Sequence, residues 1–162
     1  ADESSKFETD PGKVQNAFRR VKARNMDFPS VKLFIKQLKS SVPHDIGKKF
    51  PEWSCQWNGQ ELKFTLTWIQ GIVEQTFDNG DTIELNDKTG TIRINGCNKI
   101  PFQLAKVVTG QYLLVIGQPL KEADCTVIRA IKIQNLSPNS ALEKMWPLEV
   151  MDQMMYLTNN SS

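Results

Sequence analysis

"TLTWIQGIVEQTFDNGDTIELNDKTGTIRING", residues 65–96, contains three runs of alternating apolar and polar side chains separated by two short turns. In the first run Ile69 and Val73 share one face of an extended chain, because successive side chains of a strand point to opposite faces. Asn79-Gly80 supplies the positive φ that a tight hairpin turn needs, and the sequence KTG turns the chain again. The stretch therefore predicts a meander of three antiparallel strands.

Two further strands follow after a longer connection, residues 97–110. "QYLLVIG" (111–117) is apolar at nearly every position, so we expect it to be covered on both faces and to end at Pro119. "TVIRAIKIQNL" (126–136) is the fifth strand. This order is typical of the five-stranded Greek-key barrel called the OB-fold, in which Gly71 suits a sharply coiled strand. SH3-like barrels also have five strands, but the break after the third strand favours the OB-fold.

The sequence thus predicts a mainly β protein, a five-stranded OB-fold Greek-key barrel with an N-terminal helical extension and a C-terminal amphipathic helix. We place the OB-fold domain at residues 31–157, after a partly disordered extension over 1–30 and before a disordered tail over 158–162. Within the extension, "KVQNAFRRVKAR" (13–24) predicts a short helix whose basic outer face either contacts nucleic acid or is simply solvated. Its apolar positions follow helical spacing: Val14, Ala17, Phe18 and Val21.

The segment between the extension and the meander is less regular. "SVKLFIKQL" (30–38) follows Pro29 and fits a short strand, a helix, or a strand that runs into a helix. Residues 41–63 contain prolines, glycines and the pair Asn58-Gly59, so we expect a loop there. Three aromatic residues of this stretch are expected to cover the domain as a flap: Phe50, Trp53 and Trp57.

The end of the chain predicts a helix with a wide apolar face. Ser140 and Glu143 form an S-x-x-E capping box for a short helical turn, and Pro147 suits the first turn of a final helix over about 147–157. The apolar arc of that helix spans about 180°, more than the ~100° stripe that one packing surface needs. The arc consists of Leu148, Val150, Met151, Met154, Met155 and Leu157.

An arc of this width needs more than one surface to cover it. We expect it to contact both the barrel and a protein partner, because flexible Met side chains suit an interface that must fit an irregular surface. A helix that only plugs the end of its own barrel is the alternative. A membrane-surface helix is disfavoured, because Glu149 and Asp152 lie on the polar face, where such helices carry Lys or Arg. We therefore assign the arc to a partner interface.

Composition narrows the possible classes of protein. The 162-residue chain is 40% hydrophobic and 23% charged, which is typical of a soluble globular protein, and no apolar run reaches the about 18–20 residues of a membrane span. Cys55, Cys97 and Cys125 are far apart and predict free thiols in a reducing compartment. No nucleophile, metal-binding or dinucleotide motif accompanies the single histidine, His44, so we expect no enzyme, no cofactor and no metal.

Charge and aromatic residues bear on nucleic-acid binding, which in an OB barrel takes aromatic platforms in a basic groove on strands 2 and 3. Residues 1–50 hold eleven Lys/Arg and six Asp/Glu, a net charge of +5, whereas residues 51–162 hold nine and twelve, a net charge of −3. The outward positions of the two strands include no aromatic residue: Thr82, Glu84, Asn86, Thr91, Arg93 and Asn95. We therefore predict little or no direct binding of single-stranded DNA by the barrel.

Five short stretches carry a resemblance to a known family: "WIQG" (68–71), "LNDKTG" (85–90), "GQYLLVIG" (110–117), "AIKIQNLS" (130–137) and "MWPLEV" (145–150). In this order and at these separations they resemble the RecQ-mediated genome instability protein 2 family, the small OB-fold subunit of the RMI complex. The resemblance covers about residues 66–152, and "KLFIKQL" is weakly similar to the leading segment of that family. Residues 1–30 and 41–63 match nothing in it, and Pro147 departs from the vertebrate pattern.

The resemblance implies a nuclear, non-enzymatic scaffold that pairs with the C-terminal OB domain of the first RMI subunit through packed terminal helices. That heterodimer joins topoisomerase III to a Bloom-type RecQ helicase, and together these enzymes dissolve double Holliday junctions. The resemblance further implies a docking site for a peptide of the Fanconi anaemia M translocase, to which Lys132 and Trp146 correspond. The middle OB-fold subunit of a replication-protein-A-like or telomere-capping complex is the alternative function.

Overall fold

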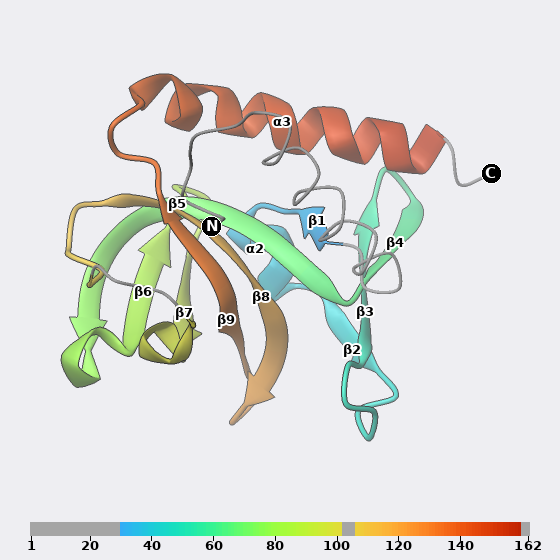
Figure 1. Ribbon diagram of the computed structural model, residues 1–162. Helices are drawn as coiled ribbons and strands as arrows, with labels where there is room; N and C mark the ends of the chain where they lie inside the picture. Colours follow the sequence, from blue (N-terminus) through green and yellow to red (C-terminus); the bar gives the residue numbers. More distant parts are fainter. Residues whose placement is uncertain (1–29, 102–105, 160–162) are drawn as a thin grey trace, which may run out of the picture.

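Five strands close into a barrel in the computed structural model, which describes residues 30–101 and 106–159 (Figure 1). The strands lie in the order β5-β6-β7-β9-β8, and a further pairing between β5 and β8 closes the barrel. Their bounds are β5 Leu66–Phe77, β6 Thr82–Asn86, β7 Thr91–Asn95, β8 Tyr112–Glu122 and β9 Cys125–Asn135. The meander of three strands, the longer link and the two last strands are confirmed.

Local backbone geometry explains two features of this barrel. Asn79 and Gly80 have φ of 57° and 85°, so the Asn-Gly pair turns the chain between β5 and β6 as expected. A Cβ atom at Gly71 would lie 2.6 Å from the carbonyl oxygen of Asn86, and one at Gly117 would lie 2.5 Å from the carbonyl oxygen of Arg129. Both positions bring two strands closer than any side chain permits, which is how a small barrel coils its longest strands.

The segment before the barrel is a strand that runs into a helix, one of the three conformations that its sequence allows. β1 (Ser30–Lys32) pairs in parallel with β5, and α2 (Ile35–Lys39) follows at once. The N–H of Ile35 donates to the Asp87 carboxylate over 2.8 Å, which ties the start of α2 to the turn between β6 and β7. β1 therefore adds a sixth strand to the sheet of the predicted five-stranded barrel.

Residues 41–63 are not a loop, and this prediction is wrong. They form a three-stranded antiparallel sheet of β2 (Val42–His44), β3 (Glu52–Trp57) and β4 (Gln60–Phe64). Asn58 and Gly59 have φ of 50° and 75° and make the hairpin turn between β3 and β4, as Asn-Gly does elsewhere in the chain. Trp53 is only 1% exposed and belongs to the core, whereas Phe50 and Trp57 are half-buried.

β8 does not end at Pro119, as its sequence suggested, but continues to Glu122. The pairing of β8 with β5 stops at Gly117, so among the described strands Pro119 pairs with β9 alone, through Ile128. A proline lacks the N–H of the sheet ladder and is tolerated where one side of the strand has no neighbour.

The final helix, α3, spans Ser140–Asn159 without interruption, so the predicted start at Pro147 is wrong. Its first free N–H groups are capped by Asn139, whose side-chain oxygen accepts a hydrogen bond from Ala141 N over 3.1 Å. Pro147 removes one helical hydrogen bond, but the buried Trp146 and Val150 on either side hold the helix against the barrel. Thr158 and Asn159, assigned to the tail, continue the helix, and residues 160–162 lie outside the described residues.

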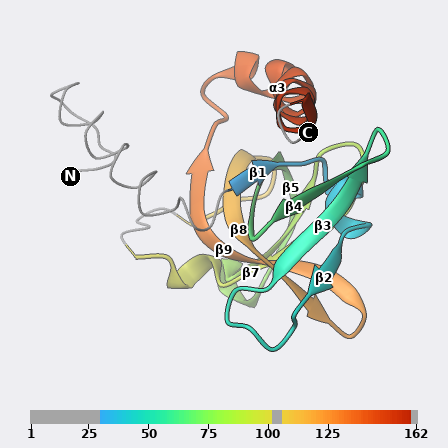
Figure 2. The ribbon, with the colours of Figure 1, turned by 90° about the vertical axis from the view of Figure 1, so that its right-hand side faces the viewer.

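α3 lies across the barrel next to β1, β4 and β5. Figure 1 shows it running along one edge of the molecule, and Figure 2 shows it nearly end-on above β1. Its inner face joins one apolar core with α2, the barrel and the sheet of β3 and β4, which includes Trp53, Phe64, Ile69, Val115, Ile128, Trp146, Val150 and Met154. The predicted helix of residues 13–24 lies outside the described residues.

Candidate partner-binding face of helix α3

The inner face of α3 belongs to the core of the chain itself. Val150 and Met154 are fully buried, so their assignment to a partner interface is wrong. The amide of Gln37 donates to the sulfur of Met154 over 3.1 Å, and the hydroxyl of Thr158 donates to the Met154 carbonyl over 2.8 Å. Leu157, also assigned to the interface, is half-buried and packs against the same core. The barrel thus covers half of the apolar arc that the sequence predicted.

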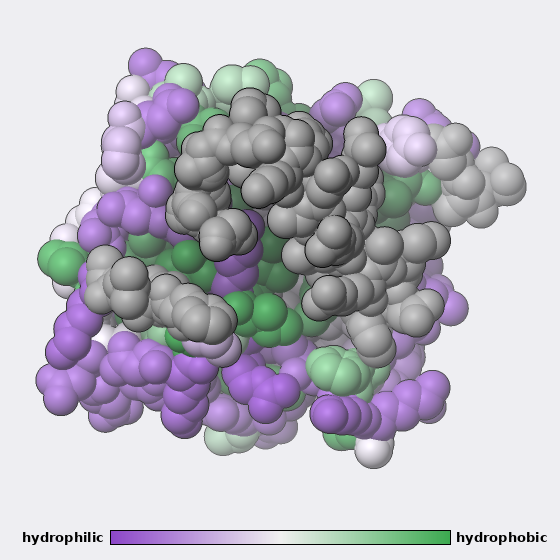
Figure 3. Space-filling view, viewed as in Figure 1, coloured by the Kyte–Doolittle hydropathy of each residue, from purple (hydrophilic) through white to green (hydrophobic). Residues whose placement is uncertain are grey.

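The other half of the arc is exposed, and we call it the outer face of α3. Leu148 is 71% exposed and Met155 is 53% exposed, and neither is part of the described core. The outer face consists of Met145, Leu148, Met151, Met155 and Tyr156. Apolar surface is visible along the edge of the molecule where α3 runs (Figure 3). Three of the six predicted interface residues, Leu148, Met151 and Met155, therefore lie where a partner can reach them.

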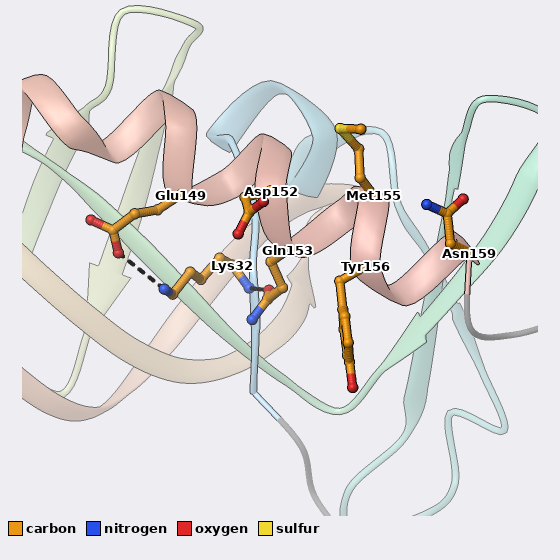
Figure 4. A pocket seen from close by; sticks show the side chains of 7 residues that line it. All are labelled: Lys32, Glu149, Asp152, Gln153, Met155, Tyr156 and Asn159. Carbon is orange, nitrogen blue, oxygen red and sulfur yellow. Dashed lines mark hydrogen bonds and ion pairs between the residues drawn. The ribbon is translucent and has the colours of Figure 1, made fainter.

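Lys32 fixes how α3 lies on the barrel. Its backbone N–H donates to the Gln153 side chain over 2.5 Å, and its ammonium group lies 3.0 Å from the Glu149 carboxylate. The same ammonium group lies 4.7 Å from the ring centre of Trp68. Figure 4 shows Lys32 between Glu149 and Gln153, which are one helical turn apart. With a side chain only 19% exposed, Lys32 holds one side of α3 against β1.

Sequence reasoning missed this contact. Lys32 is 121 residues away from Gln153 along the chain, and no spacing rule connects a strand residue to a helix at that separation. The ion pair is also partly shielded from water, so it orients α3 more firmly than an exposed pair does. The consequence is that the outer face points away from the barrel at a defined angle.

Two shallow hollows run along the outer face. Carboxylates lie beside the methionines in both of them, because Glu149 and Asp152 contribute to each. One hollow is bordered by Lys32, Gln153, Met155, Tyr156 and Asn159, and the other by Met145, Leu148, Met151 and Met155. A partner that fits these hollows needs apolar side chains together with positive charge.

The two predicted peptide-binding residues lie in different environments. Lys132 is exposed on β9, opposite Ile116 of β8, as expected. Trp146 is only 3% exposed, so the expectation that it offers a flat face to a peptide is wrong for the chain alone. Its indole N–H is buried and has no hydrogen-bond partner among the described residues. Trp146 instead contributes its ring to the core beneath the start of α3.

The face of β6 and β7 offers one aromatic ring that the sequence prediction did not consider. Phe77, at the end of β5, lies under Arg93, with 4.7 Å between the guanidinium carbon and the ring centre. Arg93 is exposed and Phe77 is half-buried, so the guanidinium group covers the ring. Among the residues that the structure describes, this one covered ring is not the series of stacking platforms that single-strand binding uses.

The described residues contain no cluster of three or more His, Cys, Asp or Glu placed to hold a metal ion. Cys55, Cys97 and Cys125 are free, which confirms the prediction for the thiols. Burial and the nearby Asp81 charge raise the pKa of Cys97 to about 12, which disfavours the reactive thiolate. Within 30–101 and 106–159, no helix has the length and apolarity to cross a membrane.

Solved structures resemble this fold. The structure of a replication protein A heterotrimer bound to ssDNA aligns with a TM-score of 0.59 at 14% identity, covering 79% of this chain and 97% of that one. The S. pombe Stn1-ten1 complex aligns with the same TM-score at 16% identity, covering 81% of this chain and 95% of that one. At this level of identity the likeness confirms the OB-fold and carries nothing further.

Relatives found by sequence identify the family more specifically than the solved structures do. The chain is 30% identical to RecQ-mediated genome instability protein 2 of Bos taurus over 57% of its own length, and 34% identical to that of Gallus gallus over 51%. It spans 58% of the Bos taurus relative and 61% of the Gallus gallus relative, or about three fifths of each.

The family model for RecQ-mediated genome instability protein 2 matches residues 29–154. The match includes residues 41–63, for which the sequence had indicated no counterpart in the family. It also spans β1, the whole barrel and α3 as far as the buried Met154. The chain therefore belongs to the RecQ-mediated genome instability protein 2 family.

Proposed function

We propose that this chain is a non-enzymatic scaffold subunit that pairs with the C-terminal OB domain of the first RMI subunit. The observation that carries the proposal is the outer face of α3, where Leu148 and three methionines remain exposed beside a fully formed core. Exposing this apolar surface is unfavourable, by roughly 25 cal/mol per Å². An apolar helix of the partner that packs along α3 removes this cost and excludes water from both hollows.

In this proposal the heterodimer joins topoisomerase III to a Bloom-type RecQ helicase in the nucleus, where the two enzymes dissolve double Holliday junctions. The family name itself points to genome stability through RecQ. Lys132, exposed on β9, is proposed to bind a peptide of the Fanconi anaemia M translocase by meeting a carboxylate or a backbone carbonyl.

Coexpression tests the pairing. Coexpression with the partner OB domain should give a soluble 1:1 complex by sedimentation. The complex should protect Met151 from oxidation, with the buried Met154 as the internal control. A chain that does not form a complex with the OB domain would contradict the proposal.

The alternative is an OB-fold subunit of a replication-protein-A-like or telomere-capping complex. The fold likeness to the replication protein A heterotrimer and to Stn1-ten1 supports the kind of fold that this alternative requires. Affinity purification from cells followed by mass spectrometry separates the two functions. Recovery of topoisomerase III supports the RMI-type scaffold, and recovery of a large replication-protein-A subunit without topoisomerase supports the alternative.

A further inference from the structure

The start of the described chain lies directly against α3. The backbone N–H of Lys32 in β1 donates to Gln153 of α3, so Ser30, two residues earlier, enters the fold beside this helix. Ser30 therefore lies close in the chain to the hollow that Lys32, Gln153 and Met155 border (Figure 4).

Within residues 1–29, the segment 13–24 has a helical sequence pattern that complements the outer face. In residues 13–24 an apolar stripe follows helical spacing, and Lys13, Arg20 and Arg24 fall on one flank of it. On α3, Asp152 lies among the exposed apolar residues, and Glu149 at their border is paired with Lys32. Apolar side chains and charges of opposite sign are thus available on both sides of one contact.

The distances permit this contact. Residues 25–29 connect the pattern to Ser30, and five extended residues reach at most about 18 Å. A helix of twelve residues is about 18 Å long, and the ten-residue step from Met145 to Met155 covers about 15 Å of α3. A helix over residues 13–24 can therefore lie along the whole outer face without stretching the connection.

We propose that residues 13–24 dock on the outer face of α3 and cover it when no partner is bound. The apolar stripe of Val14, Ala17, Phe18 and Val21 packs on Leu148, Met151 and Met155, and the cations of its flank meet Asp152. The segment then acts as an internal competitor that the partner must displace. This proposal rests on the proposed function only in taking the outer face as the partner site.

Photocrosslinking in the full chain tests the docking without any partner. A benzoylphenylalanine in place of Leu148 should crosslink within the monomer to residues 13–24, as read by mass spectrometry of the monomer band. Phe18→Asp combined with Val21→Asp puts carboxylates into the stripe and should abolish that crosslink. The matched control, Asn16→Asp with Ala23→Asp, adds the same charge on the opposite side of the predicted helix and should retain it.

The same variants should change partner binding in a defined way. If residues 13–24 cover the outer face about nine-tenths of the time, releasing them raises the affinity for the partner OB domain roughly tenfold. We expect this increase for the stripe variant, Phe18→Asp with Val21→Asp, and not for the control variant. Crosslinks that appear only in a dimer band, or that persist in the stripe variant, would overturn the docking of residues 13–24. Intramolecular docking without any partner binding would leave this inference standing and remove the proposed function instead.

Discussion

Met154 and Met155 are adjacent in sequence but lie on different faces of α3, one buried and one exposed. Met154 is fully buried and accepts a hydrogen bond from the Gln37 amide, whereas Met155 is 53% exposed beside Asp152. One residue therefore stabilises the chain, and its neighbour is available to another molecule. The outer face can therefore be changed without changing the core.

Replacing Met151 by glutamate and replacing Met154 by glutamate should have different effects. Met151→Glu places a carboxylate on the outer face, so it should prevent pairing with the partner OB domain and change stability by about 0.5 kcal/mol or less. Met154→Glu buries an unpaired charge and should lower the free energy of unfolding by about 3–5 kcal/mol. Thermal unfolding of the chain and copurification with the partner measure the two effects. Normal pairing of a folded Met151→Glu variant would remove the outer face as the interface.

Lys132→Ala should leave the heterodimer intact. It should weaken binding of the proposed Fanconi anaemia M peptide by about 1–3 kcal/mol, the loss expected for a hydrogen bond to a charged group. Lys121→Ala, at the far end of the same β8–β9 hairpin, is the matched control and should bind the peptide normally. Fluorescence titration of the peptide against both heterodimers measures the difference. Equal affinities would exclude Lys132 from the site.

Gly71→Ala should destabilise the barrel by about 1–3 kcal/mol, because the added methyl group meets the Asn86 backbone and not a side chain that can turn away. Gly90→Ala is the control, since a Cβ atom there would lie 3.6 Å from Ile35, an ordinary contact. Urea denaturation of the two variants should separate them clearly. Similar midpoints would mean that β5 and β6 can move apart at little cost.

The barrel should bind single-stranded DNA no better than about 10⁻⁴–10⁻⁶ M, and the binding should disappear as salt rises. The reason is that Arg93 covers the ring of Phe77, together with the net charge of −3 over residues 51–162. Fluorescence anisotropy with labelled oligonucleotides, for the full chain and for a chain that begins at residue 30, gives the two affinities. Sub-micromolar, salt-resistant binding by the shorter chain would favour the telomere-type alternative.

The sequence by itself determined the barrel, because alternation and Asn-Gly turns are local properties of a few residues. Asn58-Gly59 follows the same local rule, but among the prolines and glycines around it the pair was interpreted as part of a loop. Only the tertiary structure decided that β3 and β4 form there, since Trp53 and Phe64 find a place in the common core.

The width of the apolar arc on the last helix was also determined by the sequence, because the period of a helix fixes which side chains share a side. Which half faces the barrel depends on what the helix meets, and β1 decides this through Lys32, held by Glu149 and Gln153. These contacts join residues more than a hundred positions apart. Burial of Trp146, Val150 and Met154 also keeps α3 continuous through Pro147. The sequence therefore determined that two surfaces exist, and the tertiary structure decided which residues belong to each.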